Sequence, residues 1–123
     1  YPVQMSDYIL KYFDENNIDI KEVRLYNEYN NGSYLLYRGI PVFIDSRADL
    51  YAPEFNAGKD IFTDFIQSSN LEVWFEDIFS KYDITHIILY KDSKMNMIIK
   101  DAHLKGYNLL KEDDNFVFYE ITK

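Results

Sequence analysis

The most informative stretch of the chain is Tyr26–Tyr51, YNEYNNGSYLLYRGIPVFIDSRADLY. It contains a glycine-centred turn, a run of aromatic residues, a short apolar segment and a charged cluster. The apolar segment, PVFID at residues 41–45, ends in a charge and is typical of a strand buried on both faces. KEVRLYN at residues 21–27 predicts an earlier strand that runs into the stretch.

Between these two predicted strands, the turn residues allow two structures. Asn31-Gly32 can form a tight hairpin turn. Ser33 can instead cap a short helix that carries the aromatic run. We favour the helix, because Gly39 would end it just before the apolar segment begins.

Helix-like and strand-like segments alternate along the rest of the chain. Apolar residues recur at helical spacing after several capping residues. Helices are expected to begin at Pro2, Asp60 and Ser93, the last ending at Gly106, with a further helix around Trp74–Tyr82. Strands are expected for THIILY at 85–90, YNLLKE at 107–112 and FVFYEIT at 116–122, the last two joined by a turn at Asp113-Asp114-Asn115.

This order of elements predicts an α/β fold. Helical crossovers between apolar strands require parallel pairing, so we expect a three-layer α/β/α sandwich with a mainly parallel sheet and a C-terminal antiparallel hairpin. Ligands of such open sheets bind outside the carboxyl ends of the parallel strands. Asn27 and the charged cluster from Asp45 to Asp49 are expected to meet at that edge.

Composition is that of one folded soluble domain over residues 1–123, with 47% hydrophobic and 28% charged residues. The formal net charge of −8 argues against nucleic acid and anionic membrane surfaces as partners. Absence of cysteine excludes disulfides, thiolate catalysis and cysteine-ligated zinc. We expect no cofactor and no metal site. The chain begins at Tyr1-Pro2 without an initiator methionine, and we interpret it as a fragment of a longer protein.

Asp45, Arg47 and Asp49 are the strongest candidates for a site, because they are charged and follow a predicted strand. Two carboxylates around a guanidinium can bind sugar hydroxyls, or position a divalent cation if the arginine moves away. The alternative is an arginine clamp that only fixes the loop. We favour the clamp, since ion-pair networks often do no more than organise a loop.

Asn27, Tyr29 and Tyr34 are candidates for the neighbouring wall of a sugar-binding cleft, because aromatic faces and amides suit a pyranose. The favoured alternative is that Asn27 caps the short helix while the tyrosines pack. Gly32 is expected to meet a backbone need, either a positive φ or a close approach. A phosphate cradle at the following helix is a further, weaker option.

The same residues carry a resemblance to a family. The pattern Tyr-Asn-x-Tyr-x-x-Gly-x-Tyr-Leu, followed by Pro-Val-Phe-Ile-Asp-x-Arg-x-Asp-Leu-Tyr, resembles the C-terminal soluble region of certain bacterial polytopic membrane proteins. These proteins are similar to lipid-linked-sugar glycosyltransferases of the dolichyl-phosphate-mannose mannosyltransferase type. The matching residues are Asn27, Tyr29, Gly32, Tyr34 and Leu35 in the first block, and Val42, Phe43, Ile44, Asp45, Arg47, Asp49, Leu50 and Tyr51 in the second. Ser33 and Ser46 replace family glycines.

The resemblance implies a non-catalytic accessory domain on the extracytoplasmic side of the bacterial cell membrane. The catalytic carboxylates of such a transferase would lie in its membrane part. The implied partners are the protein's own membrane-embedded region and a glycan or lipid-linked sugar. Tyr51 joins the candidate substrate-binding residues on this ground.

Two other functions stay open. One is a purely structural or assembly domain whose tyrosine-rich surface contacts its own membrane bundle. The other, which we favour least, is a small hydrolase or transferase that uses Asp45 and Asp49 as acid and base. His86 and His103 are isolated in the sequence, so we expect them to be structural.

Overall fold

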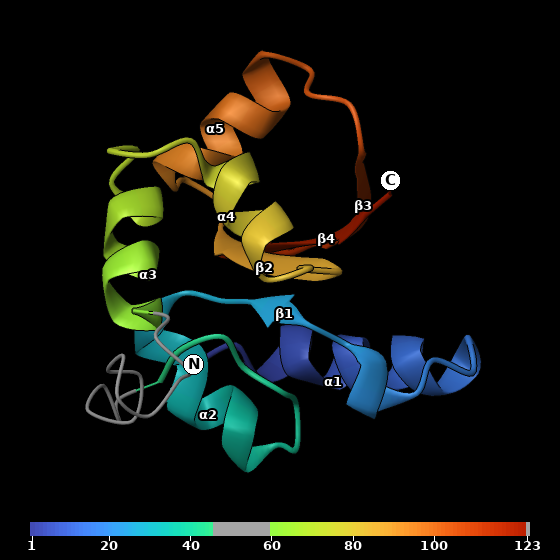
Figure 1. The fold of residues 1–123 in the computed structure, drawn as a ribbon. Coiled ribbons are helices and arrows are strands. Elements are labelled where there is room, and N and C mark those ends of the chain that lie inside the picture. The colour runs from blue at the N-terminus through green and yellow to red at the C-terminus, as the bar shows by residue number, and fades with distance from the viewer. Residues whose placement is uncertain (46–59, 123) are drawn as a thin grey trace.

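A computed structural model describes residues 1–45 and 60–122, and there the chain is a mixed α/β structure (Figure 1). Arg47, Asp49 and Tyr51 lie outside the described residues. In chain order the elements are α1 (Val3–Glu15), the 3-10 turn η1 (Ile20–Glu22), β1 (Leu25–Tyr26), the 3-10 turn η2 (Tyr29–Asn31), α2 (Gly32–Tyr37), α3 (Ile61–Ser69), α4 (Phe75–Lys81), β2 (His86–Tyr90), α5 (Lys94–Asp101), β3 (Tyr107–Glu112) and β4 (Phe116–Ile121).

The described strands form one sheet in the order β1-β2-β4-β3. β1 pairs with β2 in parallel, with Leu25 opposite His86. The β2–β4 and β4–β3 pairs are both antiparallel. The predicted C-terminal hairpin is confirmed, but the prediction of a mainly parallel sheet is wrong. The reason is that β4 of the hairpin lies beside β2, where a second parallel neighbour was expected. The three-layer sandwich stays a prediction.

The predicted strand at residues 41–45 is also absent from the structure. The amides of Phe43 and Ile44 donate to the side-chain oxygen of Asn27 instead of to a neighbouring strand. The earlier predicted strand is shortened to Leu25–Tyr26. Its first residues form η1, because the carboxylate of Asp19 accepts a hydrogen bond from the backbone N–H of Lys21 and starts a turn there.

Two helix starts are those that the sequence predicts. Asp60 accepts from the N–H of Thr63 at the start of α3, and Ser93 accepts from the N–H of Asn96 at the start of α5. α1 begins directly after Pro2. These caps satisfy backbone donors that have no partner inside a helix.

Two other helix boundaries differ from the predictions. α5 ends at Asp101, well before Gly106, and His103 then adopts a positive φ of 49° that no helix continues through. α2 begins at Gly32, so Ser33 is not its N-cap. The residue before the helix, Asn31, makes no side-chain capping bond.

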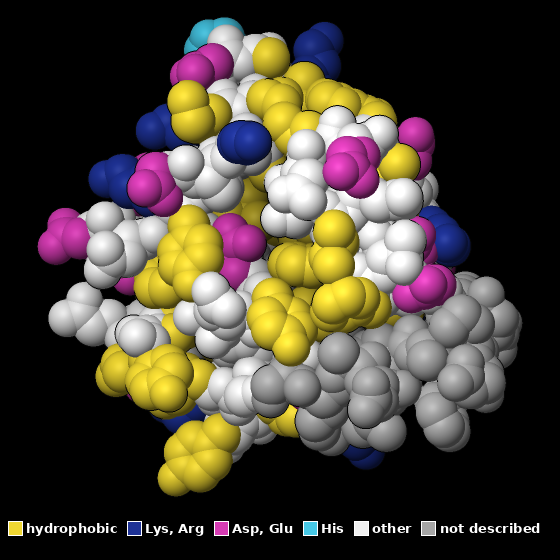
Figure 2. All heavy atoms as spheres, turned by 90° about the vertical axis from the view of Figure 1, so that its left-hand side faces the viewer, with side chains coloured by type: hydrophobic (Ala, Val, Ile, Leu, Met, Phe, Trp, Pro, Cys, Tyr) yellow, Lys and Arg dark blue, Asp and Glu magenta, His cyan; other side chains and the backbone are white. Residues whose placement is uncertain are grey.

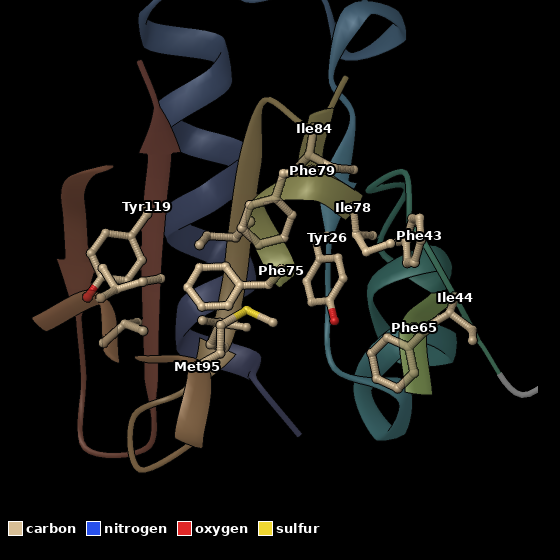
Figure 3. Packing of buried hydrophobic residues seen from close by; sticks show 14 residues of the cluster. Tyr26, Phe43, Ile44, Phe65, Phe75, Ile78, Phe79, Ile84, Met95 and Tyr119 are labelled. Carbon is tan, nitrogen blue, oxygen red and sulfur yellow. The ribbon is translucent and has the colours of Figure 1, made fainter. Parts of the chain in front are cut away.

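Two clusters of buried hydrophobic residues hold the elements together. The first joins β1, β2 and β4 to α3, α4 and α5, and its centre contains Tyr26, Phe75 and Phe79 (Figure 3). The Tyr26 hydroxyl lies 2.9 Å from that of Ser68 on α3, so this buried polar group has a partner. The second cluster joins the sheet to α1 and α2 and includes Ile9 and Leu35. No described helix has the length and apolar character needed to cross a membrane.

The parallel pair β1 and β2 gives the sheet an edge where both strands have their carboxyl ends. In Figure 1 this edge lies on the left, beside α2 and α3. The chain leaves β1 there at Asn27 and leaves β2 there at Lys91. The segments that follow the two strands form the candidate site.

Candidate functional site

Asn27 joins the end of β1 to the segment at residues 43–44. Its Oδ1 accepts from the N–H groups of Phe43 and Ile44 at 2.7 and 3.3 Å. Its Nδ2 donates to the carbonyls of Ile44 and Glu28 at 2.8 and 3.0 Å. The side chain is 0% exposed. Asn27 therefore holds residues 43–44 against the end of β1, and its hydrogen-bonding groups are directed into the protein.

Gly32 serves the same junction by allowing a close backbone approach. Its φ of −60° is that of an ordinary helix, so no positive φ requires glycine here. A Cβ at this position would lie 2.0 Å from the carbonyl oxygen of Ile44 and 2.8 Å from the Cα of Asp45. Of the two roles expected for Gly32, the close approach is the one that the structure shows.

The other predicted residues occupy different surroundings. Tyr29 is half-buried and its ring lies 6.2 Å from that of Phe62 on α3. Tyr34 stacks on Tyr1 at 5.2 Å, and its hydroxyl accepts from the Arg38 guanidinium at 3.2 Å. These rings therefore face different neighbours.

Asp45 lies at the junction itself and is 0% exposed. The structure thus brings Asn27, Gly32 and Asp45 together. Arg47, Asp49 and Tyr51 are outside the described residues, so the predicted charged cluster is seen only at its first member.

Sequence reasoning missed Glu28, a buried carboxylate at the same edge. Glu28 is 9% exposed, and its Oε2 accepts from the backbone N–H of Tyr90 at 2.9 Å, which ties the end of β1 to the end of β2. Burial raises the pKa of this carboxyl, the hydrogen bond from Tyr90 opposes the rise, and the charge of Asp92 adds to it. The sequence signal that could have identified Glu28 is its position two residues after the predicted strand residue Tyr26.

A cavity opens beside this carboxylate, between the end of β2 and the turn of the C-terminal hairpin. Its volume is about 580 Å³. It is lined by Tyr1, Asn31, Tyr90, Lys91, Asp92, Asp114, Asn115 and Phe116. None of these belonged to the predicted site. The hairpin supplies one wall because β4 pairs with β2, a neighbour relation that the expected parallel sheet did not contain.

Asn31 is the unusual member of this lining. It is 5% exposed, and its Nδ2 has no hydrogen-bond partner in the structure described for residues 1–45 and 60–122. Native structures leave few buried donors without an acceptor, because each one costs free energy. This amide therefore distinguishes the cavity from an ordinary surface hollow.

The charges around the cavity are mainly acidic. Asp92 and Asp114 are exposed carboxylates. Lys91 forms an ion pair with Glu112, with 3.0 Å between Nζ and Oε2. The hydrogen bond to Glu112 and the negative charge of that carboxylate raise the pKa of Lys91.

A metal or triad site is not formed by the described residues. Among them, no three histidine, cysteine, aspartate or glutamate side chains are grouped to hold a metal ion. His86 is buried, with its Nδ1 2.9 Å from the Thr85 hydroxyl and its ring among those of Phe13 and Phe118. This is a packing environment, as expected for an isolated histidine. His103 lies on the surface after α5.

No protein-family model, curated protein or solved structure matches this chain. The likeness of the two sequence blocks to a transferase family therefore stays an expectation. A function has to be argued from the geometry of the junction and the cavity.

Proposed function

We propose that the chain is a non-catalytic accessory domain of a glycosyltransferase-like membrane protein, on the extracytoplasmic side of the bacterial cell membrane. In this proposal it contacts a glycan acceptor or the membrane-embedded catalytic part. The chemistry of sugar transfer belongs to that membrane part, and the domain supplies a folded surface beside it.

The observation that carries the proposal is that the described residues of the family-like pattern have structural roles. Asn27 uses its amide to bind backbone groups of the junction, and Gly32 is needed for a close backbone approach. Asp45 is fully buried. An acid, base or nucleophile has to reach a substrate, so these residues suit a structural unit better than a catalytic one. The hydrolase alternative, with Asp45 as acid or base, gains no support from this geometry.

One observation favours the assembly alternative. α2 follows the junction directly, and its Tyr37 is 85% exposed while Leu36 is 39% exposed. Exposed aromatic and aliphatic side chains on one short helix suit contact with another protein surface. A domain whose main task is to dock on its own membrane bundle would use such a helix.

Cysteine accessibility tests the proposed location. The chain contains no cysteine, so a single one can be placed by Tyr37→Cys in the full-length protein, after replacement of any cysteines elsewhere. A membrane-impermeant maleimide added to intact cells is expected to label it. The matched control is Leu35→Cys on the same helix, which is 0% exposed and is expected to stay unlabelled while the domain is folded.

Labelling of position 37 in inverted membrane vesicles but not in intact cells would place the domain in the cytoplasm and contradict the proposal. A second assay addresses catalysis. The isolated chain, mixed with a lipid-linked sugar and a glycan acceptor, is expected to show no transfer, and turnover would show that the domain is an enzyme. A cross-link from the cysteine of the Tyr37→Cys variant to the membrane part would show that α2 docks there, as the assembly alternative requires, and its absence would count against that alternative.

A further inference from the structure

We propose that the cavity at the carboxyl ends of β1 and β2 binds a short neutral glycan. The site is distinct from the residues that the sequence pattern singled out, and the choice of a glycan rests on the proposed function. Figure 2 views the molecule from the side of this edge and shows hydrophobic side chains next to acidic ones over its described part. That mixture of apolar and acceptor groups is the starting point of the argument.

The first step is the buried amide of Asn31. Its Nδ2 is a donor without an acceptor among the described residues, held at the cavity by a side chain that is 5% exposed. This nitrogen is shielded from solvent, so the Asn31 side chain has to turn toward the cavity before a sugar hydroxyl can supply the missing acceptor and donate onward to a carboxylate. An apolar ligand would leave this donor unpaired and is therefore disfavoured.

The second step is an aromatic surface with a fixed position. Tyr90 and Phe116 are directly opposite each other on β2 and β4, and their rings stack with 5.2 Å between centroids. Phe116 is buried in the second hydrophobic cluster and holds the ring of half-buried Tyr90 in place, and Tyr90 offers the apolar surface on which the C–H face of a pyranose can pack. Both residues line the cavity.

The third step is that the walls are tied together before any ligand arrives. The N–H of Tyr90 donates to Glu28, and the N–H of Lys91 donates to the carbonyl of Asn115 in the hairpin turn at 2.8 Å. The side chain of Asn96 donates to the carbonyl of Lys91 at 2.7 Å. A site that is already ordered loses less conformational entropy when it binds.

The fourth step is charge, which selects a neutral ligand. Asp92 and Asp114 offer carboxylate acceptors to hydroxyl groups, but they repel a phosphate or a uronic acid. The ammonium group of Lys91 is already paired with Glu112. Since the described residues contain no cluster suited to a metal ion, a divalent cation is not the expected ligand.

The test is a titration of the ¹⁵N-labelled chain followed by amide chemical shifts. The neutral probes are the methyl glycosides of glucose, mannose and galactose and their disaccharides. The anionic probes are glucuronate and a short prenyl phosphate sugar, and the cation probes are Mg²⁺ and Ca²⁺. We expect saturable shifts at Asn31, Tyr90, Asp92 and Asn115 for at least one neutral sugar. The expected dissociation constant is on the order of 1–10 mM, as for a ligand with about a dozen heavy atoms.

Two variants connect the shifts to the site. Asn31→Ala removes the unpaired amide and is expected to weaken binding by about fivefold or more, without loss of any hydrogen bond seen for that amide nitrogen. Asp92→Asn is expected to weaken it by a smaller factor, because an amide keeps one acceptor. Asn108→Ala, an exposed amide near the far end of β3, is the matched control and is expected to bind as the wild type does.

The proposal is overturned by an absence of shifts at saturating sugar, by shifts centred elsewhere, or by equal weakening in Asn31→Ala and Asn108→Ala. Tighter binding of glucuronate or the prenyl phosphate sugar would refute the charge argument, and saturable shifts with the cations alone would identify a cation site. None of these results changes the labelling of position 37. The failure of this site and the failure of the proposed location are therefore distinguishable.

Discussion

Replacement of Gly32 by alanine tests the junction between the two sequence blocks. Gly32 has φ −60°, a value that alanine adopts readily in a helix. An argument from backbone angles alone would therefore predict a gain of up to about 1 kcal/mol from the better helix former. The packing predicts the opposite, because the new Cβ would lie 2.0 Å from the carbonyl oxygen of Ile44.

The size of the loss follows from that distance. A carbon and a carbonyl oxygen need roughly 3.3 Å, so the Ile44 carbonyl must move by about 1.3 Å from its position 2.0 Å away. Overpacking of this kind costs about 1–3 kcal/mol. The movement also disturbs the hydrogen bond from Asn27 to the same carbonyl, which adds about 1 kcal/mol. After subtraction of the helix gain, we expect Gly32→Ala to lower the unfolding free energy by about 1–3 kcal/mol.

Gly39→Ala is the matched comparison. Gly39 has φ +80°, but no atom lies within 4 Å of the place where its Cβ would be. Its replacement therefore costs only backbone strain, about 1–2 kcal/mol. Urea unfolding of both variants, followed by circular dichroism with the m-value checked, measures the two losses. A Gly32→Ala variant that is as stable as the wild type or more stable would refute the close-approach argument, whatever the loss for Gly39→Ala.

Three further predictions concern buried polar groups. Asn27→Ala removes four hydrogen bonds at the junction, so we expect a loss of about 3 kcal/mol and a melting temperature lower by about 10 °C in calorimetry; an unchanged transition would contradict it. Glu28→Gln keeps an oxygen for the Tyr90 amide and removes the buried charge. The pKa of Glu28 in the folded state is raised above its ordinary 4.5, so the stability of the wild type falls as pH rises through that folded pKa. In urea unfolding, Glu28→Gln is therefore expected to be more stable than the wild type at pH 7 but not below about pH 4. Burial lowers the pKa of His86 below 6.5, so the fold favours the neutral imidazole and stability is expected to fall as pH drops below about 6.5. When the unfolding free energy is measured against pH, this fall should be lost in His86→Phe and kept in the surface control His103→Gln.

The elements that sequence predicted best are those whose signals are local. β2 is a continuous apolar run, a signal that lies entirely within the segment itself. The hairpin of β3 and β4 is set by Asp113, whose Oδ1 accepts from the N–H groups of Asn115 and Phe116 and fixes the turn. Caps such as Asp60 and Ser93 are likewise defined within one helical turn.

The elements that sequence predicted wrongly depend on distant residues. PVFID at residues 41–45 reads as a buried strand because it is apolar, and it is indeed buried at Phe43 and Ile44. Its amides bind the side chain of Asn27, a partner that no period in the segment can reveal. The mainly parallel sheet failed for a similar reason, since the choice of β4 as the neighbour of β2 is made by tertiary packing.

The residues expected to meet at the edge of the sheet and the residues that line the cavity are different sets. Asn27 directly follows β1 and is hydrogen-bonded to Ile44, the neighbour of Asp45, so these two predicted residues lie close to the carboxyl end of β1. The cavity beside them is built from Asn31, Tyr90 and the hairpin turn. Its walls come from segments far apart in the sequence, so no local sequence motif predicts the cavity.

Hydrogen exchange of the Phe43 and Ile44 amides tests most directly whether the junction is a structural unit rather than a ligand-binding loop. Both amides donate to Asn27 in a buried setting, so we expect them to exchange in the wild type as slowly as the amides of β2. In Asn27→Ala they are expected to exchange much faster, while β2 stays protected. Rapid exchange in the wild type would mean that residues 43–44 open readily from Asn27. That result would return Asn27 to the list of side chains available to a ligand and contradict the account given for the junction.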